Sequence, residues 1–245
     1  METMFRDLKA EEIDCRISMV KQNGLSLLLY KDARVDMDIL DETVGVYNWK
    51  REHTRDNANC IVSIYDSEKK EWISKEDTGT ESNTEKEKGL ASDSFKRACV
   101  NLGIGRELYT APSIFIFPKK DIKYKNGGKE VDEFFEYKDG KYTTKTRFYV
   151  DYIDYDDNRK IKDLLIRDNK NNIRFEELSN ETAKIRDKKI MQFKKLIEEN
   201  EDRDNNFERK EVYDYFGAEN DTQIKWNDLD KAIMLLEKRL KESDK

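Results

Sequence analysis

Apolar and polar residues alternate in several short stretches of the first half of the chain, and this pattern predicts β-strands. The segments Cys15–Val20 and Leu25–Tyr30 flank Gly24, so we expect a β-hairpin there. Asp66-Ser67-Glu68 is typical of a tight turn between two strands, because these polar residues favour turns. Three further strands are therefore expected, at residues 46–54, 60–65 and 71–76.

Other segments show the spacing of helices. Residues 36–44 place three apolar side chains on one face, and Gly45 follows where a helix often ends. A longer helix is expected over 84–102, with its buried stripe within an arc of about 60°; the stripe comprises Ala91, Phe95, Ala98 and Leu102. Small residues crowd this helix and predict the close approach of another backbone. A short helix is also expected over residues 1–14.

The second half of the chain changes character near Glu181. Before that point we expect a strand at 113–117, a polar loop over 119–140 and a meander of strands at 145–155, 160–167 and 172–176. After it, apolar residues recur only at helical spacing. Two long stripes and one short helix carry them: Ile190, Phe193, Leu196 and Ile197; Leu229, Ile233, Leu236 and Leu240; Val212, Tyr213 and Phe216.

This order of elements predicts an α+β fold. Three strands followed by a helix indicate a β-β-β-α core, with an antiparallel sheet packed on a long helix. We expect a domain over residues 1–180 and a small helical domain over 181–245. The helical domain either adds stability alone or docks a partner, and the sequence leaves both interpretations open.

Composition limits how the chain can bind nucleic acid. Hydrophobic residues make up 36% of the chain, which suffices for a globular fold, but the formal net charge is -6. Binding to phosphates therefore requires a local basic surface. The segment 86–125 is such a candidate, because it holds nine basic residues against four acidic ones. The basic residues are Lys86, Lys88, Lys96, Arg97, Arg106, Lys119, Lys120, Lys123 and Lys125.

Within this segment, Lys96 and Arg97 are expected on the exposed face of the helix. Each lies roughly 130° from the centre of the buried stripe, and Asp93 precedes Arg97 by one turn, where the two can pair. The helix runs into Gly103-Ile104-Gly105-Arg106, a turn that can hold a phosphate beside its backbone N–H groups. From these residues alone, an ordinary solvated Lys-Arg pair is the alternative.

No catalytic machinery is expected. A nuclease could use the acidic cluster Asp36, Asp38 and Asp41, but the first two point apart on a helix. The lone His53 belongs to no recognisable nucleophile motif, and the chain lacks a Gly-x-x-x-x-Gly-Lys phosphate loop. We therefore predict a protein without enzymatic activity, cofactor or metal site.

The cysteines and the hydropathy pattern point to a cytoplasmic protein. Cys15, Cys60 and Cys99 are odd in number and widely spaced, so a disulfide framework or zinc site is not indicated. No apolar run approaches the ~20 residues of a membrane span. The acidic N-terminal segment lacks the pattern of a signal peptide.

Two stretches of the chain match a known family in sequence and spacing. The first is Tyr30-Lys31-Asp32-Ala33-Arg34, followed by Leu40-Asp41-Glu42-Thr43-Val44-Gly45 and Asn48-Trp49. The second is Lys88-Gly89-Leu90-Ala91-Ser92-Asp93-Ser94-Phe95-Lys96-Arg97-Ala98, followed by Gly103-Ile104-Gly105-Arg106-Glu107-Leu108-Tyr109. Over about residues 1–117 they resemble the Sak-type single-strand annealing proteins of bacteriophages, relatives of the eukaryotic recombination mediator Rad-fifty-two.

The resemblance implies a function and a set of binding residues. Proteins of this family form rings or helical arrays whose basic groove holds single-stranded DNA, and they anneal complementary strands in recombination without ATP. The family's groove cations correspond to Arg34, Lys96 and Arg97, and also to Lys31 and Arg106; Lys88 completes the candidate DNA-binding set. The chain departs from the family at Leu102, where an aromatic residue is expected.

The resemblance also implies partners and a location. We expect a homo-oligomer in the cytoplasm of a bacterial host, with a single-strand-binding protein or an exonuclease docking on the C-terminal helices. A passive single-strand binder or recombination adaptor is the alternative function. Four aromatic residues could stack on bases, but we expect them to pack in the core of the sheet; they are Tyr47, Trp49, Tyr65 and Trp72.

Overall fold

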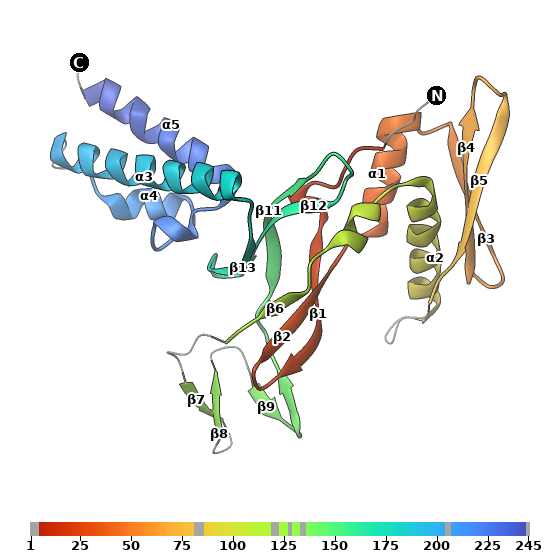
Figure 1. Cartoon of the computed structure of the whole chain (residues 1–245), viewed down its shortest axis with the longest axis horizontal. Coiled ribbons are helices and arrows are strands. Elements are labelled where there is room, and N and C mark those ends of the chain that lie inside the picture. The colour runs from red at the N-terminus through yellow and green to blue at the C-terminus, as the bar shows by residue number, and fades with distance from the viewer. Residues whose placement is uncertain are drawn as a thin grey trace. The chain divides into compact units, whose positions relative to one another are not determined.

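The computed structural model describes residues 5–80, 86–118, 123–126, 129–132, 136–203 and 207–243 (Figure 1). The chain divides into two compact units. The first comprises Met1–Ile13 and Tyr30–Thr110, and the second comprises Asp14–Leu29 and Ala111–Lys245. The fold is α+β, as the order of elements predicts.

The first unit is built on a three-stranded antiparallel sheet. Its strands are β3 (Trp49–Thr54), β4 (Asn59–Asp66) and β5 (Glu71–Thr78), with β4 in the centre. The helix α2 (Lys86–Leu102) packs against β4 and β5 (Figure 1). This arrangement confirms the predicted β-β-β-α core. The expected turn between β4 and β5 is also present, because Asp66 Oδ1 accepts hydrogen bonds from two following backbone N–H groups.

The buried face of α2 is centred on Phe95 and Ala98, as its apolar spacing predicts. Both are fully buried, and the Phe95 ring stacks on Trp49 with the ring centroids 6.2 Å apart. Ser94 and Cys99 share this buried face. The opposite face of the helix can therefore carry polar side chains that point away from the core.

The small residues of α2 allow the sheet to approach its backbone. A Cβ atom built on Gly79, directly after β5, would lie 2.5 Å from Ser94 N and 2.6 Å from Leu90 O. Ser94 Oγ also donates a hydrogen bond to Asn57 O over 3.1 Å. These contacts confirm the predicted close approach of another backbone.

The helix α1 (Ala33–Val44) links the start of this unit to β3. Asp32 caps its N-terminus by accepting a hydrogen bond from Arg34 N, and Gly45 ends it with a φ of +86°. Trp49 Nε1 donates to Asp41 Oδ1 over 2.6 Å, which ties β3 to the helix.

The helix expected over residues 1–14 is wrong for the described residues. Residues 5–9 are not helical, and a single 3-10 turn, η1 (Ala10–Glu12), follows them. Leu8 N donates to the buried carboxylate of Glu107 over 2.9 Å, and Arg6 pairs with Glu12 and Glu42. These long-range contacts draw the segment away from helical geometry. Residues 1–4 lie outside the described residues.

The second unit contains a six-stranded sheet in the order β13-β12-β11-β1-β2-β6. The strands β1 (Asp14–Lys21) and β2 (Gly24–Tyr30) form the predicted hairpin. The others are β6 (Ile114–Ile116), β11 (Phe148–Tyr155), β12 (Ile161–Asp168) and β13 (Ile173–Glu177), which confirms the predicted strand and meander. Gly24 has a positive φ, and a Cβ atom there would lie 2.4 Å from the Phe115 ring.

The loop expected over residues 119–140 contains short strands. An antiparallel pair joins β7 (Lys123–Asn126) to β8 (Lys129–Asp132), and another joins β9 (Glu136–Lys138) to β10 (Lys141–Thr143). The sequence predicted a polar loop or excursion here without strands, and the described residues form paired strands, because backbone pairing does not require apolar alternation. Residues 119–122, 127–128 and 133–135, with Lys119 and Lys120 among them, lie outside the described residues.

Three helices end the chain and confirm the predicted stripes. They are α3 (Asn180–Arg203), α4 (Arg209–Tyr215) and α5 (Trp226–Ser243). Their apolar faces share one hydrophobic core. Its buried members include Phe193, Leu196, Ile197, Val212, Leu229, Ile233, Leu236 and Leu240.

A buried arginine ties these helices to the strands of the same unit. Arg167 on β12 donates through Nε to Asp151 Oδ2 over 2.6 Å, and its Nη atoms donate to the carbonyl oxygens of Thr222 and Ile224. Asp151 also accepts a hydrogen bond from Trp226 N. Helices and sheet are thus joined by buried polar contacts, and a separate helical domain beginning near Glu181 stays a prediction.

Gly79→Ala should destabilise the first unit by about 1–3 kcal/mol, the usual cost of forcing an added methyl into a packed core. The methyl group would meet backbone atoms of α2, which cannot move away as a flexible side chain can. Urea unfolding followed through Trp49 fluorescence, with Trp72 and Trp226 replaced by Phe, measures the change. Unchanged stability would contradict the close packing of α2 on the sheet.

Candidate nucleic-acid interface

Lys96 and Arg97 lie on α2 between fully buried neighbours. Phe95 and Ala98, which flank the pair in sequence, point into the core, so the two cations are directed to either side of the outer face. The Arg97 side chain is 45% exposed, and Lys96 is half-buried. The structure therefore places Arg97 at the surface, where a phosphate can reach it.

Arg97 is held by β5 and not by its own helix. Its Nε donates to Asp77 Oδ1 over 3.3 Å, and Asn101 Nδ2 donates to Asp77 Oδ2 over 3.2 Å. The expected pair with Asp93 is wrong, because Asp93 Oδ2 accepts hydrogen bonds from Thr80 N and Thr80 Oγ1. Asp93 therefore binds the segment that follows β5 to the helix α2.

Lys96 lies on the side of α2 that faces α1. Its positive charge lowers the pKa of Asp32, although the larger causes are the hydrogen bonds from the Arg34 side chain and backbone, which bring that pKa to about 2. Arg34 donates to both oxygens of Asp32, over 2.8 Å from Nε and 3.2 Å from Nη2, and its side chain is 81% exposed. Both cations thus act on Asp32, Arg34 through hydrogen bonds and Lys96 through its charge.

Lys31 lies in the protein interior, where it has a structural role. Its side chain is buried and forms an ion pair with the fully buried Asp36, and Asp36 Oδ2 has no hydrogen-bond partner. A Cβ atom on Gly105 would lie 2.2 Å from Lys31 Cε, so the second glycine of the Gly-Ile-Gly-Arg turn makes room for this lysine. A buried, paired lysine does not reach a phosphate, and we leave Lys31 out of the interface.

Arg106 donates hydrogen bonds to backbone carbonyl groups at the C-terminal end of α2. Its Nε donates to Val100 O over 2.9 Å and its Nη2 to Asn101 O over 3.1 Å, so the guanidinium caps carbonyl groups of the last helical turn, where Val100 O also accepts a hydrogen bond from Gly103 N. The negative end of the helix dipole also lies here and disfavours an anion. The observed contacts therefore describe a helix cap, whereas the sequence predicted a phosphate-binding turn. Lys88 is exposed, a little over two turns before Lys96.

Three of the four candidate aromatic residues lie at the surface, so the prediction of core packing is wrong for them. Tyr47 is 94% exposed, and Tyr65 and Trp72 are 38% and 42% exposed. Tyr65 and Trp72 pair across β4 and β5 with ring centroids 5.4 Å apart, and Lys50 Nζ lies 4.9 Å from the Trp72 ring centroid. Trp49 alone of the four packs on the core. The alternation of β4 contained the missed signal, because Ile64 faces α2 and its neighbour Tyr65 must face away.

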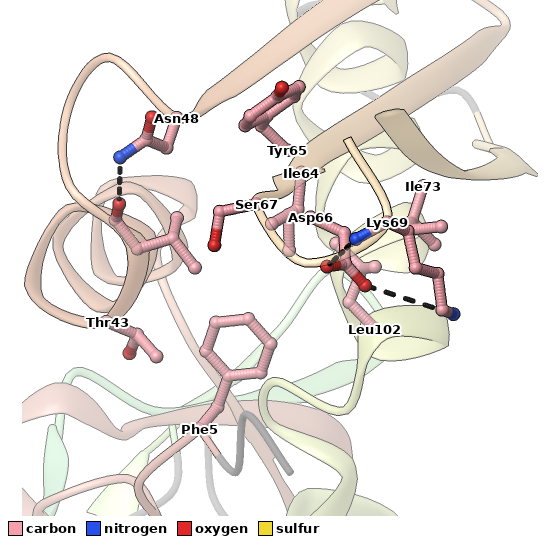
Figure 2. A pocket seen from close by; sticks show the side chains of 11 residues that line it. Phe5, Thr43, Asn48, Ile64, Tyr65, Asp66, Ser67, Lys69, Ile73 and Leu102 are labelled. Atoms are coloured by element: carbon pink, nitrogen blue, oxygen red, sulfur yellow. Dashed lines mark hydrogen bonds and ion pairs between the residues drawn. The ribbon is translucent and has the colours of Figure 1, made fainter. Parts of the chain in front are cut away.

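A pocket of about 410 Å³ opens between the start of the chain, the end of α1 and the β4–β5 turn (Figure 2). Phe5, Ile64 and Leu102 contribute apolar surface. Its charged lining residues, Asp66 and Lys69, pair with each other at 3.9 Å. This lining provides a cavity for an apolar group and does not present a general acid next to a general base.

Among the described residues, no three His, Cys, Asp or Glu side chains are grouped so that they could hold a metal ion. Of the helices described, none has both the length and the apolar composition that a membrane crossing requires.

Comparisons with family models, with curated proteins and with solved structures found no match to the chain. The resemblance to Sak-type annealing proteins therefore depends on the two sequence stretches alone and stays a prediction.

The buried carboxyl of Asp36 should make stability depend on pH. Burial raises its pKa to about 6 from an ordinary 3.8, and the charge of Lys31 opposes the shift. The folded state then binds the proton more tightly than the unfolded state. The stabilising contribution is complete below about pH 3.8 and is lost as the pH rises through about 6.

Comparison with Asp36→Asn isolates this group. The free energy of unfolding of the wild-type protein, minus that of the variant, should fall by at most about 3 kcal/mol between pH 4 and pH 6.5. Urea titrations at several pH values measure this difference. A constant difference would show that Lys31 fully offsets the effect of burial.

Proposed function

We propose that this protein binds single-stranded DNA and promotes the ATP-independent annealing of complementary strands as a homo-oligomer in homologous recombination. The observation that supports this best is the outward presentation of Arg97 beside Lys96 on α2. In the part of the chain that the structure describes, Arg97 donates a hydrogen bond only through Nε, and its side chain is 45% exposed, so its two Nη groups have no acceptor among the described residues.

A guanidinium with both Nη groups available can bind a phosphate through two parallel hydrogen bonds. Arg34 is mostly exposed and engages Asp32 through Nε and Nη2, so it can contribute charge to the same surface. Lys96 adds a third positive charge near Asp32. A row of such cations binds the DNA backbone without reading its sequence, which is what annealing of arbitrary strands requires.

The acidic net charge of the chain argues for assembly. A single subunit offers Arg34, Lys96 and Arg97, with Lys88 nearby, against a formal net charge of -6. Contacts repeated along one strand by many subunits multiply a weak individual affinity. Homo-oligomerisation therefore belongs to the proposal, as do a cytoplasmic location in a bacterial host and docking of a recombination partner on α3–α5.

A passive single-strand binder or adaptor would have the same cations. The two functions differ in one measurable property, because only an annealing protein speeds the pairing of complementary oligonucleotides in the absence of ATP.

Lys96→Ala combined with Arg97→Ala should abolish this annealing and leave oligomer size and thermal stability nearly unchanged. Neither side chain fills the core, so no cavity is opened. The slope of log affinity against log salt should fall by about 1.4 per binding subunit, since each phosphate contact on a single strand contributes about 0.7. Fluorescence anisotropy with a labelled oligonucleotide, at several salt concentrations, measures the slope.

Lys231→Ala with Lys238→Ala on α5 is the matched control, since it removes two exposed lysines from the second unit. It should leave annealing and salt dependence unchanged. If the Lys96/Arg97 variant anneals normally while remaining assembled, the DNA-binding surface lies elsewhere on the chain. If it unfolds or dissociates, the two residues are structural.

The protein should elute from a sizing column, coupled to light scattering, far above the 29.2 kDa mass of one chain. A single subunit has few cations for the proposed groove, so assembly is what gives the binding its strength. A monomer at micromolar concentration, unchanged by single-stranded DNA, would contradict the oligomeric part of the proposal.

A further inference from the structure

The carboxylate of Asp77 is fixed in place from three directions. Its Oδ1 accepts a hydrogen bond from Thr78 N over 2.7 Å, and its Oδ2 accepts one from Asn101 Nδ2 over 3.2 Å. Asn101 is itself oriented by a second hydrogen bond, over 3.1 Å, to Glu76 O. The remaining contact of Asp77 is the one from Arg97 Nε to Oδ1. Asp77 thus joins β5 to two residues of α2, four positions apart on the helix.

We infer that Asp77, supported by Asn101, is a positioning residue that orients Arg97 for a phosphate of single-stranded DNA; this inference rests on the function proposed above. The Nε contact is the decisive feature. It engages Nε, at the inner part of the guanidinium, and leaves the outer edge, formed by Nη1 and Nη2, without a hydrogen-bond acceptor among the described residues. A phosphate meeting that edge would find both donors already in place.

The alternative role of Asp77 is electrostatic and has the opposite sign. A carboxylate beside a DNA-binding arginine repels phosphates, so its removal should strengthen binding if charge alone mattered. Without Asp77, however, Arg97 would be a long side chain free to sample many rotamers. Ordering an arginine side chain costs free energy, so binding should weaken if Asp77 provides that order in advance.

The direction of the change in affinity therefore separates the two roles. Asp77→Ala should weaken single-strand binding about fivefold, the factor that corresponds to the rotamer freedom of one arginine. Asp77→Asn keeps an oxygen acceptor for Arg97 and should restore affinity to near the wild-type value. Glu71→Ala is the matched control, because it removes an acid from the same strand, β5, and should leave binding equal or slightly tighter.

A double-mutant cycle attributes the effect to Arg97. In an Arg97→Ala background, Asp77→Ala should cause no further loss of affinity for a labelled oligonucleotide, since there is no arginine left to orient. An equal loss in both backgrounds would overturn the inference, as would tighter binding by Asp77→Ala in the wild-type background. Urea unfolding of each variant shows whether any loss of affinity arises from loss of structure.

A measurement without DNA keeps the inference distinct from the proposed function. The Nε–H group of Arg97 should give a resolved NMR signal in the wild-type protein and in Asp77→Asn, and lose it to exchange in Asp77→Ala. If the wild-type protein fails to bind single-stranded DNA, the proposed function fails, and this signal still reports whether Asp77 orders Arg97. An identical Arg97 signal in all three proteins would refute the positioning role by itself.

Discussion

The contact between α2 and the β3–β4–β5 sheet determines the geometry of the first unit. The backbone at Gly79 meets Leu90 and Ser94 so closely that no side chain fits between them. With Phe95 and Ala98 buried on the same side, the rotation of α2 about its axis is fixed. This rotation also fixes the directions in which Lys96 and Arg97 leave the helix. The positions of the two candidate cations therefore follow from the packing of α2 on the sheet, and no separate element is needed to present them.

Much of the fold follows from the sequence, because it depends on local periodicity. The spacing of Ala91, Phe95 and Ala98 predicts α2 and its buried side, and Gly45 correctly marks the end of α1. The strands of the three-stranded and six-stranded sheets are expected near their observed positions. The failures arise where distant contacts override local pattern. Residues 5–9 are drawn out of helical geometry by Glu107, about a hundred positions further along the chain.

The candidate site was less predictable, for the same reason. Sequence spacing proposes Asp93 as the partner of Arg97, but tertiary structure supplies Asp77 from β5 instead. Lys31 and Arg106 have the residue types and the positions of phosphate-binding groups. One is buried against Asp36 and the other caps a helix, and neither fact is visible without the fold. A cation's availability depends on what else it touches, and spacing alone does not show that.

The acidic residues around the candidate interface show how an acidic chain can present exposed cations. Asp32 holds Arg34 and caps α1 with the same carboxylate, while Asp77 holds Arg97 and is itself held by Asn101. Each acid therefore has a structural task as a hydrogen-bond acceptor, and each leaves at least one Nη group of its arginine without an acceptor among the described residues. Lys31 shows the opposite outcome, because its side chain is buried, pairs with Asp36 and packs against Gly105. An exposed candidate cation differs here from a buried structural one in the position of its acid. Asp77 contacts only Nε of Arg97, and Asp32 contacts Nε and Nη2 of Arg34, so both guanidinium groups stay at the surface with at least one Nη group available. Asp36 lies in the core and removes Lys31 from the surface.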